Sequence, residues 1–189
     1  MANDIIKILA ICGSTRKSSS NLELIYAITD LYETRLDIEI FHEIDEIPHF
    51  NPDLDGDNPP EKTVSFRQKL TGADGILICT PEYAMGVPGT LKNALDWTVS
   101  SMEFSHKPIA LITASSVGQK AHASLMETLK VIESDIPETS QLVISFAKTK
   151  VKGNKIVDDN TLQQVKNTID SLVATIQKKV NHKPHDPNY

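Results

Sequence analysis

The sequence has few cysteines, no cluster of basic residues and no long apolar run, and each absence excludes a class of protein. Only two cysteines, Cys12 and Cys79, occur among 189 residues, and their spacing matches no zinc pattern. Each lies within an apolar run, so we expect two buried free thiols in a reducing cytosol. The formal charge is −6 and no block of lysine and arginine is present, which leaves no footprint for nucleic acid. No apolar run approaches the roughly 18 residues that a membrane span requires.

The beginning of the chain also lacks the basic segment of a secretory signal peptide. It has an acid at Asp4 and continues into an apolar run typical of a first strand. We therefore expect a cytoplasmic protein. A length of 189 residues fits one domain with a full core, predicted to span residues 1–180. Residues 181–189 are polar, contain two prolines and are predicted to be disordered.

Short apolar runs alternate with longer amphipathic segments along the chain. The runs predict strands at Ile5–Cys12, Leu36–Phe41, Gly75–Cys79, Pro108–Thr113 and Gln141–Phe146. The segments predict helices at Leu22–Glu33, at Glu61–Leu70, from near Pro88 to Thr98, at Lys120–Glu133, and onward from a cap at Asp159 or Asn160. A polar stretch, Lys150–Asp158, predicts a small hairpin that turns at Gly153 and Asn154.

This alternation predicts an α/β fold with a parallel sheet and helices on both faces, because crossovers between parallel strands are right-handed. Five strands suit a flavodoxin-like three-layer sandwich with the strand order 2-1-3-4-5, whereas a full dinucleotide-binding fold needs six. Ligands of such sheets bind beyond the carboxyl ends of the strands, near the point where the strand order reverses. The loops after the first, third and fourth strands are therefore the candidate site.

The first of these loops, Gly13–Asn21, has the composition of a phosphate site. It combines backbone N–H groups at a helix start with short hydroxyl side chains and the guanidinium of Arg16. The alternative is a polar turn whose serines only cap the helix. Two other phosphate motifs are absent, since the loop lacks both the glycine and lysine pattern of a P-loop and the three spaced glycines of a dinucleotide loop. A low-molecular-weight tyrosine phosphatase would need an arginine six residues after its cysteine, where Ser18 stands.

The second loop, Thr80–Gly89, and the third, Thr113–Lys120, suit a flat ligand. Prolines and glycines define the path of the second loop, and small residues in the third allow close approach to the backbone. Tyr83 is a candidate to pack on a ring, and Trp97 is expected to be a core or interface aromatic. Glu82 is either an acid/base catalyst or a structural hydrogen-bonding group, and both interpretations stay open. The third loop alternatively only caps the following helix.

Together the loops resemble the NADPH-dependent FMN reductase family, which includes flavodoxin-like azo and quinone reductases. The family's first motif, Gly-Ser-x-Arg-x-x-Ser-x-Asn, is matched in register by Gly13, Ser14, Arg16, Ser19 and Asn21. Its second motif runs from Pro-Glu-Tyr to Asp-Trp and is matched at Pro81, Glu82, Tyr83, Pro88, Gly89, Leu91, Lys92, Asn93, Ala94, Asp96 and Trp97. The segment Ile47–Leu54 is similar to a third family segment. The resemblance covers about residues 7–180.

The resemblance implies bound FMN. The residues it assigns to the phosphate are Ser14, Arg16, Ser19, Ser20 and Asn21. Those it assigns to the isoalloxazine are Pro81, Glu82, Tyr83 and the backbone of Ala84, Met85 and Gly86, with Ser115 and Gly118 at the far edge of the ring. Ala84 and Gly86 replace the family's usual Asn and Ser, so two side-chain hydrogen bonds near the ring are missing.

The activity implied by the resemblance is two-step hydride transfer from NADPH or NADH through FMN to a small acceptor such as a flavin, a quinone, an azo dye or a metal ion. It also implies a homodimer or homotetramer, with Asp96 and Trp97 near the subunit contact. No side chain is assigned as a proton donor, and no metal site is predicted. Two alternatives stay open, an FMN electron carrier that serves a protein partner and a flavin-free protein that kept the fold.

Overall fold

A five-stranded parallel sheet forms the centre of the molecule in this computed structural model, which describes residues 5–181. The strand order is β2-β1-β3-β4-β5, as the sequence predicts. The strands are β1 (Ile6–Cys12), β2 (Leu36–Phe41), β3 (Gly75–Thr80), β4 (Ile109–Ala114) and β5 (Gln141–Ile144). Every residue of β3 and β4 is buried, which explains why these two strands are apolar apart from Thr80 and Thr113.

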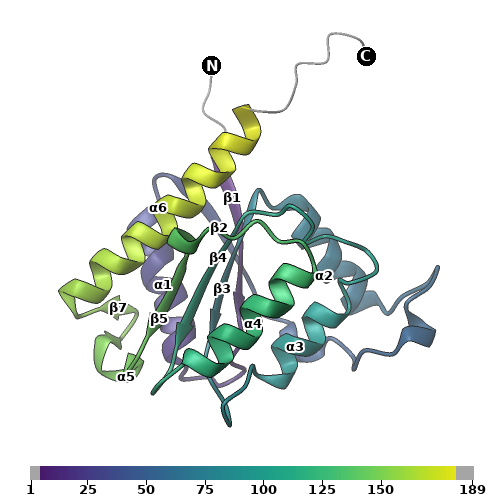
Figure 1. Cartoon of the computed structure of the whole chain (residues 1–189), viewed down its shortest axis with the longest axis horizontal. Coiled ribbons are helices and arrows are strands. Elements are labelled where there is room, and N and C mark those ends of the chain that lie inside the picture. Colours follow the sequence, from purple (N-terminus) through teal and green to yellow (C-terminus); the bar gives the residue numbers. More distant parts are fainter. Residues whose placement is uncertain (1–4, 182–189) are drawn as a thin grey trace.

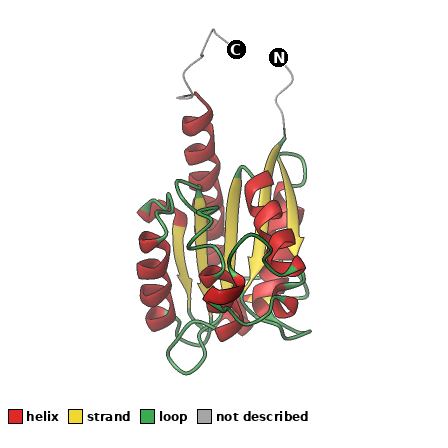
Figure 2. Cartoon of the chain, turned by 90° about the vertical axis from the view of Figure 1, so that its right-hand side faces the viewer, coloured by secondary structure: helices red, strands yellow, loops and turns green. Residues whose placement is uncertain are grey.

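Helices cover both faces of the sheet and make it the middle of three layers (Figure 1, Figure 2). One face carries α1 (Ser20–Tyr32) and α6 (Asp159–Asn181), and the other carries α2 (Glu61–Gly72), α3 (Gly89–Asp96) and α4 (Gln119–Val131). Each face has its own apolar core, with Leu24, Ile28 and Ile169 on the first and Phe66, Leu95 and Trp97 on the second. The flavodoxin-like fold predicted from the alternation of elements is confirmed.

The predicted cysteines lie side by side in the sheet. Cys12 at the end of β1 is the register partner of Cys79 on β3. Both are buried free thiols, as predicted. Burial raises the pKa of the Cys12 thiol and raises that of Cys79 well above its usual value. The thiols therefore stay protonated near neutral pH and act as small apolar side chains.

The structure corrects the sequence analysis at the last strand. β5 ends at Ile144, two residues before the predicted end at Phe146. Phe146 has a φ of 57°, a left-handed conformation that no strand accommodates. A short helix that was not predicted, α5 (Ala147–Lys150), follows it. The predicted hairpin then forms from β6 (Val151–Lys152) and β7 (Lys155–Ile156).

The cap of the last helix is one residue earlier than predicted. Oδ1 of Asp158, and not a group of Asp159 or Asn160, accepts hydrogen bonds from the backbone N–H of Thr161 at 2.8 Å and from its hydroxyl at 2.6 Å. Asn181, the first residue of the predicted tail, is the last residue of α6. Residues 182–189, the rest of that tail, lie outside the described part of the chain.

Candidate functional site

A cavity of about 420 Å³ lies beyond the carboxyl ends of β1, β3, β4 and β5. Residues predicted for the site from all three candidate loops line it: Ser14, Arg16, Ser19, Ser20, Asn21, Pro81, Glu82, Tyr83 and Ser115. Ala84, Met85, Gly86 and Gly118 were also predicted but are not among the residues that line the cavity. The volume is in the range that small-molecule sites occupy.

The first wall of the cavity is the loop that joins β1 to α1. Gly13 can only be a glycine here, because a Cβ at this position would lie 2.3 Å from Oγ1 of Thr80. Its N–H donates to the carbonyl of Cys79 at 2.8 Å, which ties the loop to the neighbouring strand. Ser19 caps α1, since its Oγ accepts from the N–H of Asn21 at 3.3 Å. The predicted capping interpretation therefore applies to Ser19.

Other polar groups of this loop have no partner among the residues that the structure describes. The side chains of Arg16 and Ser20 make no hydrogen bond or ion pair with any residue that the structure describes. Asn21 donates from Nδ2 to the carbonyl of Ala114 at 2.9 Å, yet its buried Oδ1 has no partner among the described residues. Buried polar atoms without a partner are rare in native proteins. Helix capping alone therefore does not explain the polar side chains of this loop.

The second wall, after β3, contains a tight turn. The N–H of Tyr83 donates to the carbonyl of Gly86 at 3.1 Å, and the N–H of Gly86 donates back at 2.9 Å. Ala84 and Met85, between them, have φ values of 49° and 62°. Two successive positive φ angles define a type I′ turn, which favours Asn or Gly over Ala. The turn directs Met85 to solvent, where 75% of it is exposed.

Tyr83 connects this turn to the first loop. Its hydroxyl lies 3.3 Å from Oγ of Ser14, and 46% of the residue is exposed at the edge of the cavity. A half-exposed aromatic ring whose hydroxyl is already held has one side available for packing. The role of Tyr83 beside a planar ligand stays a prediction.

The carboxylate of Glu82 makes a hydrogen bond within the chain. Its Oε2 accepts a hydrogen bond from the backbone N–H of Ala121 at 2.9 Å, in the first turn of α4. A carboxylate at a helix N-terminus satisfies a free N–H and complements the helix dipole. Gly118, at φ 105°, precedes this helix as its N-cap residue. Of the two interpretations left open for Glu82, the structure therefore supports the hydrogen-bonding one.

The second half of the long sequence motif lies in α3 and its C-cap, and its side chains hold the loop that contains Pro48 and Phe50. Asn93 donates from Nδ2 to the carbonyl of Pro48 at 3.0 Å and accepts from the N–H of Phe50 at 2.7 Å. Trp97 donates from Nε1 to the same Pro48 carbonyl at 2.8 Å and is fully buried. Its ring meets that of Phe50 edge-on at 5.1 Å. Trp97 is thus a core aromatic within one chain.

A third wall is the loop after β4, which contributes Ala114, Ser115 and Ser116 from the predicted segment Thr113–Lys120. One further wall was missed by the sequence analysis: it comes from the turn after β5 and consists of Phe146, Ala147, Lys148 and Thr149. The predicted strand order makes β5 a neighbour of β4, so its carboxyl end had to lie near the site. Because β5 was predicted to continue to Phe146, the sequence analysis did not recognise that the turn after this strand lines the cavity.

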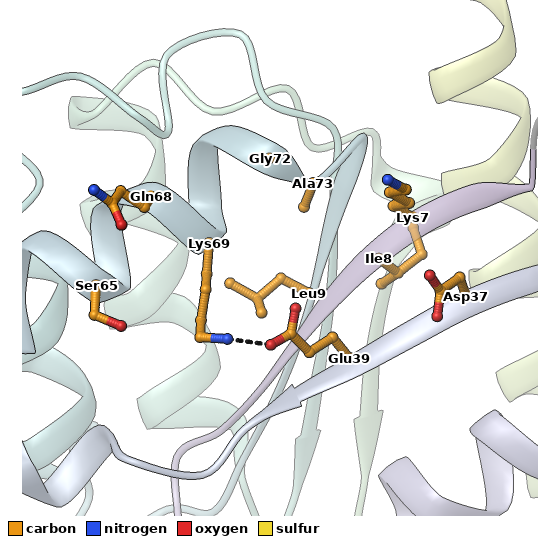
Figure 3. Close-up of a pocket in the computed structure, with 10 residues that line it drawn as sticks. All are labelled: Lys7, Ile8, Leu9, Asp37, Glu39, Ser65, Gln68, Lys69, Gly72 and Ala73. Atoms are coloured by element: carbon orange, nitrogen blue, oxygen red, sulfur yellow. Dashed lines mark hydrogen bonds and ion pairs between the residues drawn. The ribbon is translucent and has the colours of Figure 1, made fainter.

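A separate groove of about 490 Å³ lies on the α2 face, at the edge of the sheet (Figure 3). It is lined by charges of both signs, and Lys69 pairs with Glu39 across it. Lys7 and Asp37 are near the beginnings of β1 and β2. The groove is therefore away from the carboxyl ends of the strands, where ligands of such sheets bind.

Two further features are absent from residues 5–181. No group of histidine, cysteine and carboxylate side chains in this range is arranged to hold a metal ion. Among the same residues, no helix has the length and apolar character needed to cross a membrane.

Residues 6–149 match the model of the NADPH-dependent FMN reductase family. The chain belongs to that family. It is an enzyme of the NAD(P)H-dependent FMN or quinone reductase type. The resemblance read from the loop motifs is confirmed.

Relatives in the NADPH-dependent FMN reductase family match over nearly their full length. The chain is 30% identical to an NAD(P)H-dependent FMN reductase of Pseudomonas aeruginosa over 183 residues, covering 93% of this chain and 98% of that one. It is 29% identical to a 2-hydroxy-1,4-benzoquinone reductase of Burkholderia over 184 residues, covering 92% and 98%. Among solved structures, FerB of Paracoccus denitrificans, a flavoenzyme NAD(P)H:(acceptor) oxidoreductase, superposes with a TM-score of 0.82 at 28% identity, covering 92% and 98%.

Proposed function

We propose that this protein binds FMN in the cavity beyond β1, β3, β4 and β5 and uses it to reduce a small acceptor with NADPH or NADH. The observation that carries the proposal is the unpaired polar surface of the loop before α1. The guanidinium of Arg16, the hydroxyl of Ser20 and the buried Oδ1 of Asn21 have no partner in the described chain. Such groups at a helix start fit a phosphate with an attached polyol.

The residues that line the cavity fit the two halves of FMN. Ser14, Arg16, Ser19, Ser20 and Asn21 would hold the phosphate and the adjoining ribityl chain. Pro81, the backbone around Glu82 and the ring of Tyr83 would line one side of the isoalloxazine, and Ser115 would lie at its edge. Ala84, Met85, Gly86 and Gly118 would shape this wall through the turn and the start of α4.

When bound, FMN supplies the hydride chemistry, accepting two electrons from a nicotinamide and delivering them to an acceptor. The chain's own groups orient the flavin and hold its phosphate. Tyr83 stays in place through its hydroxyl contact with Ser14 and the paired hydrogen bonds of the turn. No side chain is assigned a proton-transfer role, because the carboxylate of Glu82 is held by the N–H of Ala121.

The acceptor class is a small molecule that can reach the exposed side of Tyr83. Quinones fit because they are flat, and relatives from Burkholderia and Pseudomonas putida are named as quinone reductases. Flavin, azo and metal-ion acceptors remain predictions from the family resemblance. Assembly as a homodimer or homotetramer and a cytoplasmic location also stay predictions.

The experiment is an absorption spectrum of the purified protein after FMN has been added and the excess removed, followed by anaerobic NADPH and then NADH. We expect flavin to be retained and its visible absorbance to bleach with a reduced nicotinamide. Adding a benzoquinone should then restore the colour. Retained flavin that no nicotinamide bleaches would favour the electron carrier. Loss of all flavin would overturn the proposal.

A further inference from the structure

The short helix α5 closes the cavity from a position that the sequence motifs do not include. Phe146, Ala147, Lys148 and Thr149 all line the cavity. Among the residues that line the cavity, Arg16, Glu82 and Lys148 carry a charge. Glu82 keeps its negative charge but its Oε2 is held by an N–H of α4, so Arg16 and Lys148 are the cations available to an anionic ligand.

Lys148 lines the same cavity as the first residues of α1. The hydrogen bond from Asn21 to Ala114 places the first turn of α1 over the end of β4, and β5 is the strand next to β4. β6, which follows α5 directly, packs against α1, and Val151 shares a core with Leu24. Lys148 and Ser20 are therefore on neighbouring walls, and the turn at Tyr83 forms another part of the lining.

The position of α5 is fixed by hydrogen bonds to the loop after β4. The N–H groups of Phe146 and Ala147 donate to the carbonyls of Ser116 and Ser115 at 3.2 and 3.0 Å. The hydroxyl of Ser145 donates to the carbonyl of Val117 at 3.0 Å. A backbone held in this way costs little further ordering when a ligand binds.

Neither cation is neutralised within the described chain. Arg16 and Lys148 form no ion pair with any residue from 5 to 181, although other surface lysines such as Lys62 and Lys92 do. This placement of unpaired positive charge contrasts with a formal net charge of −6 for the protein. Two cations on different walls match the dianionic charge of a phosphate monoester, which carries about −1.5 to −2 at neutral pH.

We propose that Lys148 is a second phosphate-binding residue, which together with Arg16 holds the phosphate of FMN between α1 and α5. The proposal rests on the proposed binding of FMN and extends that site to a residue outside the two matched motifs. The 2′-phosphate of NADPH has the same chemistry and is the rival ligand for this side chain. Because β6, which follows α5 directly, packs against α1, whose first turn carries Ser20 and Asn21, we favour the flavin phosphate.

The test compares FMN with riboflavin, which has the same ring and ribityl chain but no phosphate. Flavin fluorescence titrations of the apoprotein would give dissociation constants for wild type and Lys148→Gln. We expect the FMN constant to rise about tenfold in the variant, as for loss of one charge-assisted hydrogen bond. The riboflavin constant should stay within about twofold, because the lost contact is to the phosphate. Lys148→Arg should restore most of the affinity for FMN.

Lys152→Gln is the matched control, since it removes an equal charge from the adjacent strand β6 at a residue that does not line the cavity. It should leave both flavin constants unchanged. Equal changes for FMN and riboflavin in Lys148→Gln, or no change for either, would overturn the proposal. A higher KM for NADPH but not for NADH, with the FMN constant unchanged, would assign Lys148 to the dinucleotide and would also overturn it. Failure of wild type to bind FMN would instead refute the proposed function, and this inference with it.

Discussion

The loop Gly13–Asn21 and the helix α3 carry equally distinctive sequence patterns, but their polar side chains are used in opposite ways. In α3 and its C-cap, the amide of Asn93 and the indole of Trp97 are occupied by the backbone of the Pro48 loop. In the loop before α1, Arg16 and Ser20 have no partner among the described residues. A motif residue whose bonds are all internal stabilises the fold, whereas one left unpaired at a cavity is available to a ligand.

This difference divides the family's long second motif into two parts. Pro81, Glu82 and Tyr83 line the cavity, while Asn93 and Trp97 clamp a loop. Arg67 strengthens the clamp, because its Nε donates to the carbonyl of Trp97 at 2.9 Å and its guanidinium pairs with Asp55 at 2.6 Å. Substitutions in the two regions should therefore change different measured quantities.

The largest effect is expected from Trp97→Ala. Removing a fully buried indole leaves a cavity and removes one of the N–H donors to the carbonyl of Pro48, which should lower the free energy of unfolding by about 3–5 kcal/mol. Urea unfolding of the apoprotein would measure it. Trp97→Phe should cost much less, because the ring still fills the core and Pro48 still accepts from Asn93. If Trp97→Ala lowered the free energy of unfolding only slightly, Trp97 would not have the stabilising role inferred here.

Arg16→Ala should behave in the opposite way. We expect the dissociation constant for FMN to rise about 10- to 150-fold, since one charge-assisted contact is lost. The stability of the apoprotein should change by less than about 0.5 kcal/mol, because the side chain has no internal partner. Lys17→Ala, at a neighbouring residue that does not line this cavity, is the control. If Arg16→Ala instead destabilised the apoprotein and left the affinity for FMN unchanged, Arg16 would be a structural residue and not a ligand-binding one.

Glu82 lies between the two classes, because it lines the cavity yet makes an internal bond. Glu82→Ala should lower the free energy of unfolding by about 0.5–2 kcal/mol through loss of a helix cap. Glu82→Gln keeps an acceptor for Ala121 and should retain most of the stability and the turnover of quinone. A normal fold with abolished turnover in Glu82→Gln would instead identify an acid/base role.

The smallest effect concerns the turn that positions Tyr83. Ala84 has a φ of 49°, so Ala84→Gly should relieve strain and raise the free energy of unfolding by about 0.5–1 kcal/mol. Ala174→Gly, at an exposed position within α6, should lower it by about 1 kcal/mol. Thermal unfolding of both variants would show the opposite signs. Destabilisation by both would mean that the turn does not strain Ala84.

The sequence was sufficient for the fold and for much of the lining of the cavity. Alternating apolar runs and amphipathic segments determine a parallel sheet, because buried parallel strands must be apolar and crossover helices must cover their faces. The strand order then brings the carboxyl ends of β1, β3 and β4 to one edge. Ser14, Arg16, Ser115 and the Pro81–Tyr83 segment follow those ends directly, so local position was enough to place them at the cavity.

What the tertiary structure decided were the contacts between segments far apart in the chain. Glu82 and Ala121 are 39 residues apart, and Trp97 and Pro48 are 49 apart, so no local pattern could show which polar groups would be occupied. The end of β5 was misjudged because Gln141–Phe146 looks like one apolar strand, whereas the chain turns at Phe146 to bond with the loop after β4. That turn carries Lys148 to the cavity. Local periodicity determines which elements form, but which polar groups remain free depends on the packing of those elements.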